Sequence, residues 1–434
     1  MTGKTVLWIL GLIGLILLAL VPFAYDVFPF LPPGLINDYS LHVLIISFYY
    51  AVLASSWSLL MGQAGQFSFA HMAFAGLAAY TTGMMSVFWG TSPLTGIIVS
   101  TLVAGVFGLI IGLLVLRLRS TYLALFTIAF AEILRLVINA EKDYTGGGNG
   151  LQMEPLFPNG LDLGFYQFAP VDKIPPYFVM FFLMLALIGF MMWLANTRFG
   201  LFLRAIREDE EAAAALGVDV IRYKVLVFVV TSMIVGLVGG VRAHYISIIS
   251  PNDMIILWMS LVITMAVLGG IESLIASAIG GIVVFITLEY LRTNFATSSV
   301  MTVALTLILA VTLYQFGRYL ARQLKKPLSG MQRNIAAVVA AVVGYGLAAL
   351  IAGPLTTGLS YTYYDLSGSL FPEQIDMSDW RLVFFGLALM LTLRFYQNGL
   401  LYPLIQRVYR AGTLADTVAK REAARLAAEA EVQS

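Results

Sequence analysis

The sequence contains no cysteine and few charged residues. The absence of cysteine excludes disulfides, thiolate metal sites and cysteine nucleophiles. Charged residues make up 11% of the chain, against about 25% in an average soluble domain. The net charge is only +1, which excludes the strongly basic balance typical of proteins that bind nucleic acid. We therefore expect neither a thiol-based site nor a nucleic-acid partner.

Histidine is also scarce, and its three copies, His42, His71 and His244, are too far apart in sequence to form a local metal motif. The glycine-rich stretch "TGGGNG" at 145–150 follows no predicted strand and precedes no G-K-[ST], so it does not form a nucleotide-binding loop. No nucleophile with a neighbouring base is visible. We expect no metal site, no cofactor and no catalytic site.

What the chain has instead is a hydrophobic content of 60%, with several runs of about 20 apolar residues such as 6–25. Hydropathy predicts an all-α, polytopic transmembrane helical bundle of about twelve spans. The predicted spans lie near residues 6–25, 40–60, 66–88, 95–116, 121–138, 176–195, 223–246, 255–270, 273–291, 298–317, 334–352 and 381–401. The spans at 66–88 and 255–270 are the weakest, and either is expected to be broken or re-entrant. The first run lacks a cleavage pattern, which favours an uncleaved span.

The basic residues predict the orientation, because cytoplasmic loops carry an excess of lysine and arginine. Three basic loops fall on one side of the twelve-span arrangement: Arg117 and Arg119; Arg198, Arg204, Arg207, Arg222 and Lys224; and Arg318, Arg322, Lys325, Lys326 and Arg333. The acidic loops at 139–175 and 353–380 fall on the other side. Both termini are therefore expected in the cytoplasm, with a cytoplasmic helical tail at 404–434.

The segment 204–224, "RAIREDEEAAAALGVDVIRYK", concentrates charge between two apolar spans. Its alanines favour a helix, Asp209 and Glu210 suit the positive N-terminal end, and Gly217 suits the position after the C-terminus. Two pairs at i,i+4 spacing, Arg204 with Glu208 and Arg207 with Glu211, would add local support. On charge alone, an ordinary solvated loop explains the segment equally well.

The spacing of Glu211, Ala212, Ala213 and Gly217 reproduces E-A-A-x-x-x-G and resembles the coupling loop of ABC importer permeases. Five further blocks resemble the permeases of branched-chain amino acid ABC importers, specifically the longer, M-type permease of the pair. They are "GQFSFAHMAFAGLAAY" at 65–80, "LRSTYLALFTIAFAEILRL" at 118–136, "TGGGNGL" at 145–151, "GGVRAHYISIISP" at 239–251 and "MAVLGGIESL" at 265–274. The downstream stretch "VLVFVV" lacks the proline common in the wider importer family.

This resemblance implies a short cytoplasmic coupling helix within the loop 198–222 that docks on a cytoplasmic ATPase. It also implies several partners: two ABC ATPase subunits, a homologous partner permease, an extracytoplasmic solute-binding protein, and the lipid bilayer of a bacterial inner membrane. The residues carried over to the coupling loop are Arg204, Arg207, Glu208, Asp209, Glu211, Ala212, Ala213 and Gly217. ATP hydrolysis would then reside in the partners.

The resemblance also divides the chain. Residues 1–39 form an N-terminal span and outer loop, 40–292 the permease core, and 379–403 the final span. Residues 293–378 form a segment that such permeases usually lack. We interpret this segment as an inserted transmembrane hairpin with an outer loop. A hairpin crosses the membrane twice, so the orientation of the following span is preserved.

Polar groups inside spans are candidates for the solute pathway, because they are costly there. The candidates are Ser68, His71, Tyr122, Thr127 and Glu132. Structural alternatives exist for two of them: Glu132 can neutralise Arg135 three residues later, and His71 can form a hydrogen bond across a helix interface. Arg242 and His244, near the outer end of their span, are expected to snorkel to the surface.

The leading hypothesis is a permease subunit for branched-chain amino acids, and similar permeases carry urea, short amides or aromatic acids. The alternative class is a secondary transporter coupled to an ion gradient, which normally needs several intramembrane carboxylates. Only Glu132 and Glu289 are available, and both lie near predicted span ends. We therefore favour the ABC permease.

Overall fold

The computed structural model describes residues 3–23, 37–115, 120–162, 167–170 and 172–294. The predicted spans at 298–317, 334–352 and 381–401, most of the inserted segment 293–378, and the tail 404–434 lie outside the described residues.

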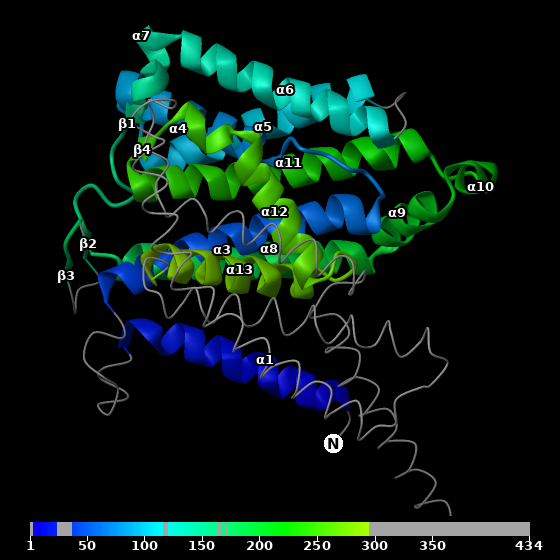
Figure 1. The fold of residues 1–434 in the computed structure, drawn as a ribbon, viewed down its shortest axis with the longest axis horizontal. Coiled ribbons are helices and arrows are strands. Elements are labelled where there is room, and N and C mark those ends of the chain that lie inside the picture. The colour runs from blue at the N-terminus through cyan, green and yellow to red at the C-terminus, as the bar shows by residue number, and fades with distance from the viewer. Residues whose placement is uncertain (1–2, 24–36, 116–119, 163–166, 171, 295–434) are drawn as a thin grey trace, which may run out of the picture. The chain divides into compact units, whose positions relative to one another are not determined.

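The described part of the chain is predominantly α-helical, as predicted (Figure 1). Its long helices are α1 (Gly3–Leu20), α3 (Asp38–Ser58), α4 (His71–Trp89), α5 (Pro93–Val115), α6 (Ser120–Ala140), α8 (Ile174–Asn196), α11 (Val220–Ile246), α12 (Ile256–Gly269) and α13 (Leu274–Asn294). Shorter elements are η1 (Val21–Phe23), the π-helical turn η2 (Leu59–Gln63), α7 (Lys142–Thr145), η3 (Gly147–Asn149), α9 (Arg198–Glu208), α10 (Glu210–Ala215) and η4 (Pro251–Met254).

Five of the described helices are long and apolar enough to cross a membrane. They are Asp38–Gln63, Pro93–Leu114, Tyr122–Ala140, Ile174–Asn196 and Val220–Ile246. The sequence predicted helices at each of these places, and a helix of this length matches the thickness of a hydrocarbon core. The chain is a multi-pass membrane protein.

The two weakest predicted spans are shorter than expected. Residues 66–70 are not helical, so α4 begins only at His71. Two side chains form hydrogen bonds with this non-helical backbone. The Trp57 indole donates to the Ser68 carbonyl at 2.9 Å, and the Phe69 amide donates to Thr127 Oγ1 at 3.0 Å. Helix α12 has 14 residues, or about 21 Å at 1.5 Å per residue, which is too short to cross a bilayer alone.

Helix α3 lies at the centre and α6 at the edge. The apolar window of α3 is 94% buried, whereas that of α6 is 17% buried. Helix α11 packs along α5, α4 and α3, and α3 also contacts α8 and α12. Because α3 is surrounded by other helices, a shift at either of its ends must be accommodated by its neighbours.

Four two-residue strands lie at one end of the bundle and were not predicted from the sequence. Strand β1 (Leu151–Gln152) pairs with β4 (Ile248–Ile249), and β2 (Leu161–Asp162) pairs with β3 (Gln167–Phe168), both antiparallel. The first pair ties the loop after α6 to the end of α11. Figure 1 shows β1 and β4 at the opposite end of α11 from α9 and α10. We call these the β4 end and the α10 end.

Candidate functional site

The segment between α8 and α11 folds as two helices rather than the single helix that the sequence predicted. Asp209 interrupts them with an extended backbone (φ −157°, ψ 110°). Its carboxylate accepts hydrogen bonds from the amides of Glu211 and Ala212, both at 3.0 Å. The placement of Asp209 near a helix N-terminus is confirmed, since it is the residue that caps α10.

Gly217 ends α10 as predicted. Its φ is +85°, a left-handed conformation that glycine adopts without steric cost. Its amide donates to the Ala214 carbonyl at 2.9 Å, and the Val218 amide donates to the Ala213 carbonyl at 3.1 Å. This pair of bonds is the Schellman arrangement that closes a helix C-terminus. The backbone direction after α10 is therefore fixed by local geometry.

Helix α10 projects away from the bundle (Figure 1). Only Ala213 among its residues is buried, and the following Leu216 is 86% exposed. An ion pair between Glu210 and Lys224 joins the start of α10 to α11. The result is a short, capped helix that exposes two glutamates and three alanines, with an exposed leucine after it, while its base is held by α11.

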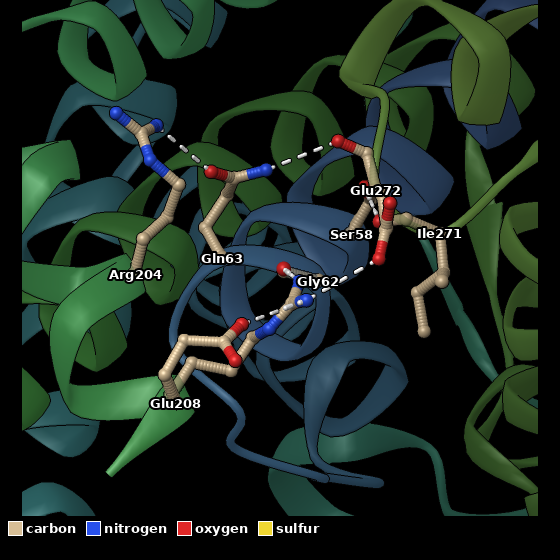
Figure 2. Close-up of polar contacts among 8 residues, drawn as sticks. Ser58, Gly62, Gln63, Arg204, Glu208, Ile271 and Glu272 are labelled. Atoms are coloured by element: carbon tan, nitrogen blue, oxygen red, sulfur yellow. Dashed lines mark hydrogen bonds and ion pairs between the residues drawn. The ribbon is translucent and has the colours of Figure 1, made fainter. Parts of the chain in front are cut away.

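Arg204 and Arg207 of α9 do not form the predicted pairs with Glu208 and Glu211 at i,i+4 spacing. The helix ends at Glu208, so Glu211 is no longer one turn beyond Arg207. Both arginines instead extend to the end of α3, as Figure 2 shows for Arg204. Arg204 donates to Gln63 Oε1 at 3.2 Å and to the Ala195 carbonyl at 2.9 Å.

Arg207 contacts two other segments at once. Its Nη1 donates to the Gly62 carbonyl, and its Nη2 lies 3.2 Å from Glu272 Oε1 and 3.3 Å from Glu208 Oε1. Bonds from a guanidinium to carboxylates and carbonyls are among the stronger polar contacts in proteins. Arg207 thus joins α9 to η2 and to the turn between α12 and α13.

The end of α3 also binds that turn directly (Figure 2). Ser58 Oγ donates to the Ile271 carbonyl at 2.7 Å, and Gln63 Nε2 donates to the Glu272 carbonyl at 3.1 Å. The backbones approach so closely that a Cβ added to Gly62 would overlap the Ile271 carbonyl oxygen. We call this set the arginine cluster: Ser58, Gly62, Gln63, Arg204, Arg207, Ile271 and Glu272.

Sequence reasoning singled out only the two arginines of this cluster. Glu272 lies in the block "MAVLGGIESL", which was noted for its resemblance but not for a contact with α9. Gln63 and Gly62 lie just before the first quoted block and carried no local signal. Contacts of this kind, between segments more than 60 residues apart, come from the tertiary fold rather than from spacing.

The five pathway candidates separate into two groups. Ser68, His71 and Thr127 are buried near one another. They are linked through the bond from the Phe69 amide to Thr127, and His71 Nε2 lies 3.4 Å from Ser56 Oγ on α3. The expected hydrogen bond of His71 across a helix interface is confirmed.

The other two candidates, Tyr122 and Glu132, lie on α6 away from this group. Tyr122 is 60% exposed. Glu132 pairs with Arg135 at 2.5 Å, and its side chain is half-exposed. The predicted neutralisation of Glu132 by Arg135 is confirmed.

The prediction that Arg242 and His244 snorkel to the surface is wrong. His244 is fully buried, and its ring contacts Thr82 Oγ1 and the Glu154 carbonyl, both at 2.8 Å. Arg242 is largely buried and faces Asp253, with 3.6 Å between Nη1 and Oδ2. The residues that cover these two side chains belong to the loop after α6 and to η4. Hydropathy does not predict that these segments fold back onto the end of α11.

Within the described residues, no group of three or more histidine, cysteine, aspartate or glutamate side chains is arranged to hold a metal ion.

Residues 39–313, more than half of the chain, match the family described as the permease component of branched-chain amino acid transport systems. The chain belongs to this family. The permease is 26% identical over 279 residues to the high-affinity branched-chain amino acid transport system permease protein LivM of Salmonella typhimurium, and 26% identical over 278 residues to LivM of Escherichia coli. It is also 27% identical over 239 residues to a probable LivH permease of Methanocaldococcus jannaschii.

The matches to the two bacterial LivM proteins cover 60% of this permease and 65% of each relative's length. The LivH match covers 54% of this permease and 73% of that relative. No solved structure matches the chain. Transport permeases of this kind are not enzymes in themselves.

Proposed function

We propose that this chain is the membrane-spanning permease subunit of an ATP-driven importer for branched-chain amino acids or related small solutes, and that α10 is its contact with a cytoplasmic ATPase. The observation that carries the proposal is the combination at one end of α11. There, α10 is a short, exposed helix that is capped at both ends. It adjoins the arginine cluster, which joins α9 to the ends of α3 and α12. The α10 end is then the cytoplasmic end, in agreement with its arginines.

The geometry supports a mechanical role in three steps. A partner that binds the exposed face of α10 moves α9 and α10 as its own domains close. Arg204 and Arg207 carry that movement to Gln63 and Gly62 at the end of α3, because charged hydrogen bonds resist separation. Glu272 carries it to the turn before α13. Two helices of the core are thereby connected to one external helix.

The remaining partners follow from the family. Two ATPase subunits require two permeases, and the second is a homologous permease. The α5 and α6 helices have wide apolar exposed faces, including Leu113, Leu125 and Ile133, which suit lipid or a partner helix. The loop between α6 and α8, which carries the glycine-rich stretch, lies at the β4 end and is the proposed docking place for a solute-binding protein.

The test is coexpression with the ATPases encoded beside this chain, followed by copurification in detergent. Wild type is expected to copurify with them. Gly217→Pro is expected to lose them, because proline fixes φ near −65° and cannot adopt the +85° that Gly217 has. Gly217→Asn is the matched control, since asparagine tolerates the left-handed region and retains the turn.

Failure would take a specific form. If wild type does not associate with the ATPases, and solute flux through the reconstituted chain follows a proton or sodium gradient, the chain is a secondary transporter. If both glycine variants retain the ATPases equally, the binding surface is not α10.

A further inference from the structure

A small cavity lies near the β4 end of α11, away from the arginine cluster. It is lined by residues of α3, α4, α11, β4 and η4 and by Ser250, which lies between β4 and η4; the polar lining residues are Tyr49, Tyr80, Arg242, Ser250 and Asp253. Its volume is about 10 Å³, which is space for about one water molecule. The loop that carries Ser250 and Asp253 borders it, and Asp253 is the more exposed member of the charged pair, at 34% against 17% for Arg242.

The polar groups of this cavity are not all satisfied within the described part of the chain. The Nε atom of Arg242 and the hydroxyl of Tyr80 are buried and have no hydrogen-bond partner there. A buried polar group without a partner costs free energy, and a guanidinium inside a membrane protein is especially costly. A water molecule or a bound solute in the cavity would supply the missing bonds.

Arg242 and Asp253 face each other as a loose pair. Their closest atoms are 3.6 Å apart, longer than the 2.7 to 2.9 Å typical of a charge-assisted hydrogen bond. The guanidinium is held from the other side by the ring of Tyr49, 5.2 Å from its centroid, a favourable cation–π geometry. The cavity therefore presents one positive and one negative group, fixed in place but not tightly bound to each other.

We propose that Arg242, Asp253 and Tyr80 form a solute site of this permease that takes an α-amino acid zwitterion. The carboxylate of the solute binds the fork of Arg242, with the Tyr80 hydroxyl beside it, and the ammonium group binds Asp253. A zwitterion neutralises both charges at once, which neither a simple amine nor a simple acid achieves. The site rests on the proposed function, because it supplies a place for the solute between entry at the β4 end and release.

At its present size the cavity does not admit an amino acid, so the site is closed in this conformation. The solute enters when the loop that carries Ser250 and Asp253 separates from α4. Gly76 and Met254 are neighbours across that boundary, since a Cβ on Gly76 would meet the Met254 side chain. The side chain of a methionine is flexible and adapts to such a separation.

The first test uses the absence of native cysteine. Ser250→Cys places the sole thiol of the chain in the cavity lining, and Asp38→Cys places it on an exposed residue at the start of α3, outside the lining. The rate of maleimide labelling is measured with leucine, with 4-methylpentanoate, which lacks the ammonium group, with isoamylamine, which lacks the carboxylate, and with urea. A bound ligand that blocks access to the thiol reduces the labelling rate by a factor of 1 + [L]/Kd. Leucine at about twice its Kd therefore slows labelling about threefold.

Leucine is expected to protect Ser250→Cys and not Asp38→Cys, and the two single-charge analogues and urea are expected to protect neither. Adding Arg242→Lys should abolish most of the protection, because lysine retains the charge but not the bidentate fork. Labelling that is unchanged by leucine, or slowed equally by urea, overturns the proposal. This readout needs no ATPase, so it is independent of whether the chain binds one.

The second test is uptake by the complete transporter in proteoliposomes. Arg242→Lys and Asp253→Asn are expected to raise the KM for leucine at least about tenfold, because each removes a polar contact between the site and the solute. Copurification with the ATPases should stay at the wild-type level. Asp38→Asn removes the same charge outside the cavity and should leave the KM unchanged. Wild-type KM in both cavity variants overturns the site, whereas failure of wild type to bind ATPases overturns only the proposed function.

Discussion

The arginines at the two ends of α11 have opposite surroundings. At the α10 end, Arg207 uses both of its terminal nitrogens on the chain's own groups, Gly62, Glu208 and Glu272. At the β4 end, Arg242 is more deeply buried, yet its Nε atom has no partner within the described residues. Arg207 holds segments of the protein together, whereas Arg242 keeps a hydrogen-bond donor that another molecule can use. The difference separates a mechanical part of the molecule from a binding part.

Helix α11 connects these two ends without interruption. Its 27 residues extend about 40 Å at 1.5 Å per residue. It packs along α4, α5 and α3, so a tilt at the α10 end alters its packing near Arg242. On the proposed function, binding of a partner at the α10 end would change the width of the cavity in this way.

Loss of the Arg207 side chain is expected to have the largest effect. Arg207→Ala removes the bond to the Gly62 carbonyl, worth about 1.5 to 3 kcal/mol, and two partly exposed ion pairs, worth about 0 to 1 kcal/mol each. Solute uptake per ATP hydrolysed should therefore fall at least about tenfold. Association with the ATPases should remain, because α10 is unchanged. Uptake and ATP hydrolysis are measured together in proteoliposomes. Arg198→Ala, at the start of α9, is the control, and wild-type coupling in Arg207→Ala would contradict the role of the cluster.

A substitution of intermediate effect tests the close approach at the α10 end without removing a charge. Gly62→Ala places a Cβ on the Ile271 carbonyl, and such overpacking typically costs about 1 to 3 kcal/mol. The melting temperature of the detergent-solubilised protein should therefore fall. Gly189→Ala in α8 is the matched control, since its added Cβ meets nothing within 4 Å. Equal melting temperatures for both variants would show that α3 and the turn 270–273 do not depend on this contact.

The smallest effect is expected on α6, whose ion pair belongs to neither end of α11. The double variant Glu132→Gln with Arg135→Gln removes a pair of partly exposed charges, and such pairs contribute about 0 to 1 kcal/mol. Leucine uptake should change by less than about twofold, because neither residue borders the cavity. A large rise in KM would instead place Glu132 on the solute pathway and weaken the contrast between the two ends.

Hydropathy predicted the positions of the long helices well, since helices such as α5 and α8 are almost uniformly apolar. Local chemistry also predicted the end of α10 at Gly217, because the left-handed conformation depends on one residue. It also placed Asp209 at a helix N-terminus, but it failed just before Asp209, where α9 ends at Glu208 and the helix does not continue from Arg204 to Glu211. The competing principle there is side-chain bonding to the backbone, which the alanine-rich pattern concealed.

The tertiary contacts were harder to predict from the sequence. Nothing in the sequence places Glu272 beside Arg207 or Asp253 beside Arg242, because each pair joins segments separated by a helix or a loop. The buried state of Arg242 depends on η4 covering the end of α11, and a position near a span end predicts the opposite. The candidate site was therefore recognised in part, from α10 and two arginines, while the groups that they bind required the structure.

The most direct test of the central claim is a cross-link from α10 to the ATPase. Leu216→Cys and Trp89→Cys would place single thiols on two exposed residues, 86% and 74% accessible, at opposite ends of the bundle. With a bifunctional reagent, Leu216→Cys should give a cross-linked product with a copurified ATPase, and Trp89→Cys should give none. A cross-link from Trp89→Cys, or none from Leu216→Cys while the ATPases remain bound, would contradict the assignment of α10 as the contact.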